Sequence, residues 1–243
     1  MSRYLVLSFA LAACTSTEEA ARVDLPVSTA GTSFAPAATD LDYQVSVERM
    51  SVAVSGIQFT IEGEMHTGLA PPGTVAHPGH SAGGEVTGEL PGDYVFQWSG
   101  QTRPTLGVAT MIVGYYLGAN FSFRTAVAAD VPAGDPLVGH AIHLSGTVSK
   151  AGVSKPFDAL FDVEPNTNVI GAVFEDEINE TSTETLGFVF FPTDPSEGDT
   201  PFDGVDFFTT FTGASIEIRP GSDTHNIIRR AIQTHDHYGV VPQ

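Results

Sequence analysis

Short runs in which apolar and polar residues alternate recur from residue 41 to about residue 191, and this pattern constrains the fold more than any other feature. A period of two places apolar side chains on one face of a strand. In one clear run, Ile57, Phe59 and Ile61 alternate with the polar Gln58 and Thr60. Gly, Pro and Asp clusters separate the runs, without intervening helical patterns. The sequence therefore predicts an all-β domain over 41–243, arranged as an antiparallel two-sheet β-sandwich.

Three local details refine this prediction. The alternation over 44–54 changes phase near Glu48 and Arg49, which predicts a β-bulge. Gly152 lies between two strand patterns, in a position typical of a hairpin turn. One amphipathic helix is expected over 224–235, capped by Ser222 and Asp223, so the sandwich carries one C-terminal helix.

The charge of the chain limits its partners. Asp and Glu number 29 against 10 Lys and Arg, which gives a formal net charge of −19. A surface this acidic repels phosphate backbones, so we expect no nucleic acid partner. Cys14 is the sole cysteine of the sequence, which excludes an intramolecular disulfide and a thiolate metal cluster.

The first fourteen residues have the layout of a secretory signal. Arg3 precedes an apolar run over 4–13, which at about ten residues is shorter than the roughly 20 that span a bilayer as a helix. The run ends in Leu11-Ala12-Ala13-Cys14, and this segment resembles the lipobox of bacterial lipoproteins. The resemblance implies a signal peptide over 1–13 and a lipid on Cys14 that anchors the chain to a membrane. Thr15, rather than Asp, implies an outer-membrane location in the cell envelope, facing either the periplasm or the surface.

Residues 14–40 are expected to form the lipidated cysteine and a flexible tether. The segment is small, polar and aperiodic, so it has too little apolar surface to offset the entropy of ordering. The folded domain is then expected to begin at residue 41.

Histidines are the strongest chemical signal, because six of the eight occur in close pairs. Imidazole is a preferred ligand of zinc and copper, and short spacing lets one segment supply two ligands. The predicted metal ligands are His77, His80, His235, His237, His66, His140 and His143.

Each pair also has a simpler interpretation. His77 and His80 flank a Pro-Gly turn that can exist without metal, and His235 and His237 suit the C-terminal end of a helix. His140 and His143 lie on opposite faces of a regular strand, so hydrogen-bonded, half-buried histidines are an alternative there. His225, in the first helical turn, is expected on the surface.

Acidic clusters offer a second type of metal site. A Pro- and Gly-containing loop carries five carboxylates with the hard oxygen ligands that calcium prefers. These are Asp194, Glu197, Asp199, Asp203 and Asp206. A solvated loop is the alternative. The acidic run over 175–184 is expected to be a solvated hairpin or strand edge.

Together these features predict a lipid-anchored, non-enzymatic protein that captures or buffers zinc or copper at the cell envelope. Glu64 and Asp236 are candidate partners of the ligating imidazoles. A structural or adhesive surface domain without metal is one alternative. A zinc hydrolase with Glu64 or Glu85 as base is another, although none of the common catalytic motifs occurs in the sequence.

The lipid anchor is directly testable. We expect Cys14→Ser to abolish membrane retention, because serine provides no thiol for lipid attachment. The measurement is fractionation of a detergent-free lysate, with the unaltered protein in parallel. A variant that still sediments with membranes would contradict the lipoprotein prediction.

Overall fold

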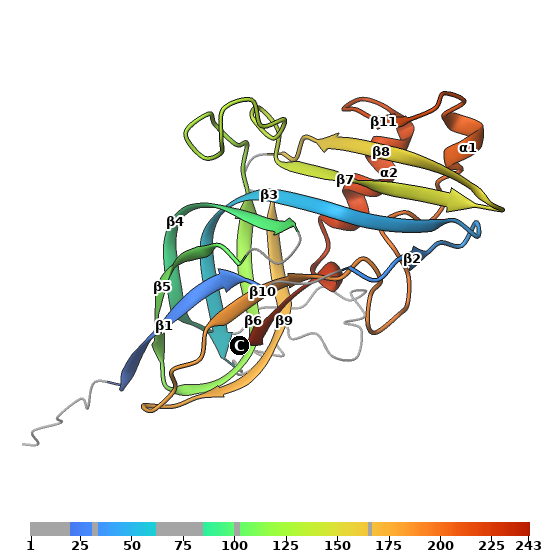
Figure 1. The fold of residues 1–243 in the computed structure, drawn as a ribbon. Helices are drawn as coiled ribbons and strands as arrows, with labels where there is room; N and C mark the ends of the chain where they lie inside the picture. The colour runs from blue at the N-terminus through green and yellow to red at the C-terminus, as the bar shows by residue number, and fades with distance from the viewer. Residues whose placement is uncertain (1–19, 31–33, 62–84, 100–102, 165–166) are drawn as a thin grey trace, which may run out of the picture.

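The computed structural model describes residues 20–30, 34–61, 85–99, 103–164 and 167–243 (Figure 1). Of these described residues, 53% lie in strands and 9% in helices, which confirms a mostly β fold with a short C-terminal helix. The strands are β1 (Arg22–Thr29), β2 (Ala37–Ala38), β3 (Gln44–Ile61), β4 (Glu85–Ser99), β5 (Thr105–Ile112), β6 (Gly114–Phe123), β7 (Ile142–Lys150), β8 (Val153–Phe161), β9 (Asn168–Ile178), β10 (Leu186–Phe190), β11 (Ile216–Ile218) and β12 (Tyr238–Pro242). The helices are α1 (Phe207–Thr210), α2 (Asp223–Ile232) and the 3-10 helix η1 (His235–His237).

The strands form one mixed sheet in place of the two antiparallel sheets that we predicted. Hydrogen-bonded neighbours run β3–β4–β5–β1–β10–β12–β9–β6, and β6 pairs with β3 again, so this part of the sheet closes on itself. Three pairs are parallel: β1 with β10, β12 with β9, and β11 with β8. Alternation shows which face of a strand is buried, but it carries no information about which strands pair.

β3 joins the closed part of the sheet to an outlying ribbon. Its residues 44–52 pair with β7, and its residues 54–61 pair with β6, while β4 follows its other edge. β7, β8 and β11 therefore extend beyond the closed part, and α1 and α2 lie beside this extension (Figure 1). Of the five described histidines, His143 lies in β7 of this extension, His140 just before β7, and His225 in the adjacent α2.

Aromatic side chains fill the interior of the closed part. Phe96 stacks on Phe188 with ring centroids 4.6 Å apart, and Trp98 donates its indole N–H to the Phe188 carbonyl over 2.9 Å. Phe59 and Tyr238 are fully buried among them. Such rings contribute large buried apolar areas and specific edge-to-face contacts, so this interior is a packed core.

The expected tether contains a core strand, which corrects the boundary at residue 41. β1 lies between β5 and β10, and Leu25 and Val27 are fully buried. Pro26 obscured this strand, because proline lacks the N–H that a central strand uses. The structure accommodates Pro26 just before the pairing with β10 begins at Val27.

The local predictions are confirmed. The register between β3 and β7 shifts between Val47 and Arg49, as the phase change predicted. Ala151 and Gly152, both with positive φ, form the two-residue turn between β7 and β8. α2 begins after Ser222, whose hydroxyl oxygen accepts the His225 N–H, but it ends at Ile232 and leaves His235 to η1.

Gly146 gives a test of the β3–β7 pairing. A Cβ at this position would overlap the Ser46 carbonyl oxygen, whereas a Cβ at Gly114 would meet Ile61 at an ordinary 3.5 Å. We expect Gly146→Ala to lower the free energy of unfolding by about 1–3 kcal/mol, because backbone must move.

The measurement is urea unfolding, with Gly114→Ala as the control, for which we expect a change within about 0.5 kcal/mol. Equal losses in the two variants would contradict the close β3–β7 approach.

Candidate functional site

The predicted metal ligands divide between described and undescribed parts of the chain. Cys14, Glu64, His66, His77 and His80 lie outside the described residues. His140, His143, His235 and His237 are described. Among the described residues, the one group of three or more clustered ligand atoms consists of carboxylates and contains no histidine.

His140 and His143 have separate aspartate partners. Nδ1 of His140 lies 2.6 Å from Oδ1 of Asp162, and Nε2 of His143 lies 2.8 Å from Oδ2 of Asp158. Arg219 pairs with the other oxygen of Asp158 at 2.8 Å. The two imidazoles therefore contact different carboxylates, and the described structure does not bring them together at one metal site.

His143 also faces Ser51 across the β3–β7 pairing. The two residues are opposite each other in register, and they are 3% and 1% exposed. Nδ1 of His143 and the Ser51 hydroxyl are buried without a hydrogen-bond partner among the described residues. Ser51, His143 and Asp158 thus lie near one another, but Ser51 is not hydrogen-bonded to His143 and its burial leaves no access for a substrate.

His235 and His237 lie in η1, where the chain passes from α2 to β12. Nδ1 of His237 lies 3.0 Å from the Phe191 carbonyl, and the Phe191 N–H donates to the His237 carbonyl over 2.9 Å. His235 lies 3.4 Å from Asp236, which we predicted as an imidazole partner. These bonds join η1 to the first residue of the loop that follows β10.

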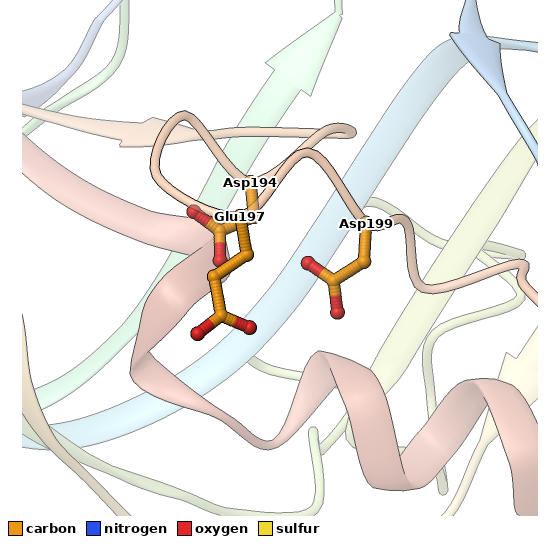
Figure 2. Close-up of side chains that lie close together, drawn as sticks. All are labelled: Asp194, Glu197 and Asp199. Carbon is orange, nitrogen blue, oxygen red and sulfur yellow. The ribbon is translucent and has the colours of Figure 1, made fainter. Parts of the chain in front are cut away.

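That loop brings three of the five predicted acidic ligands together. Asp194, Glu197 and Asp199 each offer an oxygen within 4.8 Å of the others. Figure 2 shows the three side chains on this loop. The Asp194 N–H donates to the Asp199 carbonyl over 2.9 Å, and the Ser196 N–H donates to Oδ1 of Asp194 over 2.6 Å. The loop is therefore folded back on itself, with Asp194 only 4% exposed.

The other two acids of the predicted calcium set have different roles. Asp203 accepts backbone N–H groups from Thr200 and Asp40, at 2.7 and 2.9 Å. Asp206 caps α1 and accepts the Tyr43 hydroxyl over 2.6 Å. The Tyr43 hydrogen bond is the main cause of the lowered pKa of Asp206. The calcium prediction is thereby reduced to Asp194, Glu197 and Asp199.

Sequence reasoning missed the partners of the described histidines. Asp158 and Asp162 belong to the polar face of the β8 alternation, so the pattern indicated their exposure but not their neighbours. His225 was expected on the surface and is 3% exposed, stacked on Phe161 with ring centroids 5.3 Å apart. Its position in a first helical turn carried no signal for this burial.

Comparisons of the chain with protein-family models, with curated proteins and with solved structures find no match.

The His143–Asp158–Arg219 contacts generate a stability prediction. We expect Asp158→Ala to lower the free energy of unfolding by about 1–3 kcal/mol, because the buried His143 ring loses its acceptor. The control is Asp162→Ala, directly after the end of β8, which removes an exposed pair with His140 and should cost less than about 1 kcal/mol. Chemical denaturation at pH 7.5 measures both, and a larger loss for Asp162→Ala would contradict the assignment.

Proposed function

We propose that this protein is a lipid-anchored protein of the cell envelope that captures or buffers a divalent metal ion at the loop over 191–199. The convergence of Asp194, Glu197 and Asp199 is the observation that supports this proposal. Calcium is the ion that three carboxylates favour, since it prefers hard oxygen ligands.

Electrostatics favours a cation at this loop. Three carboxylates within 4.8 Å repel one another, in a chain that already carries a formal charge of −19. A divalent cation reverses this repulsion into attraction, and each carboxylate contributes a ligand atom. Because the loop is folded by its own backbone hydrogen bonds, part of the ordering cost is met before the ion binds.

The histidines of η1 favour zinc as the second candidate. His237 is bonded to Phe191, only three residues before Asp194 in the sequence. A set of carboxylate and imidazole ligands is suited to zinc. Zinc or copper at clustered histidines, including His77 and His80, remains part of this proposal.

The anchor would hold the domain near the membrane surface. β1 begins at Arg22, so seven residues separate it from Cys14. Fully extended, such a segment spans roughly 25 Å. None of the helices in the described part of the chain combines the length and the apolar character needed to cross a membrane.

Isothermal titration of the purified protein with calcium and with zinc tests the proposal. We expect binding to be lost in the triple variant Asp194→Asn, Glu197→Gln, Asp199→Asn, because its amides cannot supply the charge. The matched control is Glu175→Gln, Glu177→Gln, Glu180→Gln, which removes the same charge from exposed positions and should retain the affinity.

The identity of the metal follows from the pH dependence of binding. If η1 supplies imidazole ligands, zinc affinity falls between pH 7.5 and 5.5, because protons compete for the ring nitrogens. The variant His235→Gln, His237→Gln should then remove zinc binding and leave calcium binding in place. Equal binding by the triple acidic variant and its control would overturn the proposed site.

A further inference from the structure

His225 occupies the junction between α2 and β8, where it makes contacts with both elements. Its ring stacks on Phe161 of β8, with an interplanar angle of 23°. Its Nε2 lies 3.4 Å from the Asp162 backbone nitrogen, and its Nδ1 lies 3.2 Å from Oδ1 of Asn226. α2 thus reaches the end of β8 through a buried histidine.

The hydrogen bonds specify the protonation state of this ring. Nε2 can accept the Asp162 N–H only with a free lone pair, so the proton is on Nδ1, where it can be donated to Asn226. This is the neutral imidazole. A second proton on Nε2 would remove the acceptor and set an N–H against the Asp162 N–H.

We propose that His225 is an acid-sensitive latch, whose protonation releases α2 (Asp223–Ile232) from the end of β8. The neutral ring holds the helix at neutral pH. The protonated ring is buried, lacks its acceptor and lies in the first turn of a helix, where the positive end of the helix dipole opposes a cation.

The groups around His225 together lower the pKa of its ring, which favours the neutral form. Burial is the main cause that lowers the pKa of His225; Arg229 lowers it further and the Asn226 hydrogen bond and Asp162 raise it. His140 also lowers the pKa of His225, and its own Nδ1 lies 2.6 Å from Oδ1 of Asp162. Glu164 lines the same shallow pocket as Asp162, His225 and Arg229.

The sign of the pH effect follows from this pKa. In the released helix His225 is exposed and takes up a proton near its ordinary pKa of about 6.5. The attached helix takes up that proton only at lower pH. Attachment is therefore complete above about pH 6.5 and weakens as pH falls below it, because the released state binds more protons.

We expect the release to be local, because apolar contacts of α2 with the main core do not depend on the protonation of His225. Ile228 and Ile232 are fully buried in the main core, and their burial is independent of pH. Protonation of His225 thus raises the population of the opened helix while the closed part of the sheet stays intact. For one unit of pKa depression, this population rises by up to about tenfold.

Hydrogen exchange of the full chain at pH 7.5 and 5.0, corrected for intrinsic exchange rates, tests the latch. We expect the opening equilibrium of the α2 amides to increase at pH 5.0, with little change for amides of β3 and β6. In His225→Phe, which keeps a ring on Phe161 but cannot titrate, this pH dependence should disappear. In the control His140→Gln it should persist.

Three outcomes would overturn the proposal. These are an α2 opening equilibrium independent of pH in the unaltered protein, a persisting pH dependence in His225→Phe, and an equal increase across β3 and β6. Should His225→Phe fail to fold, NMR titration of the His225 ring in the unaltered protein replaces it. A ring that titrates at or above the ordinary histidine value would exclude the latch.

Discussion

The structure depends on the length of β3. With 18 residues, this strand pairs with β7 along its first half and with β6 along its second, while β4 follows its other edge. The closed part of the sheet and the β7–β8–β11 extension therefore share one continuous backbone. The bulge between Val47 and Arg49 lies in the half that pairs with β7, and the Gly146 approach to Ser46 lies beside it. A side chain larger than glycine at this contact would overlap the Ser46 carbonyl oxygen and force the backbone to move.

Histidines and aspartates gather around β8 and the residue that follows it. Asp158 holds His143 and Asp162 holds His140, while His225 of α2 accepts the Asp162 N–H. On protonation, His225 loses its acceptor role toward the Asp162 N–H. The carboxylate loop over 191–199 lies after β10 and is bonded to η1, so the proposed metal site and the proposed latch are separate in the chain.

Much of the local structure was predictable from the sequence, and the pairing was not. Alternation located strands in β3, β4, β6, β7, β8 and β10 but not β5 or β9, and the capping residue Ser222 located the start of α2. β1 escaped detection because Pro26 interrupts a short pattern, although Leu25 and Val27 are core residues. The acidic loop was predicted as a group of five, yet Asp203 and Asp206 bind backbone and Tyr43. Whether such an aspartate can serve as a metal ligand or instead caps backbone N–H groups depends on hydrogen-bond partners from distant segments. The sequence pattern does not reveal those partners.

The sequence by itself determined the strand-rich fold, the acidic charge that argues against nucleic acid, and the helix that follows Ser222. Periodicity and net charge depend only on the order and the kinds of residues, so they could be derived without coordinates. Tertiary structure alone decided that the sheet closes, that β1 belongs to it, and that Asp194, Glu197 and Asp199 converge. It also decided that His225 is buried against Phe161. Sheet closure, the place of β1 and the burial of His225 depend on contacts between segments far apart in the chain, which form only when the elements pack. The three carboxylates converge because their loop folds back on itself through backbone hydrogen bonds, which the order of residues alone does not reveal.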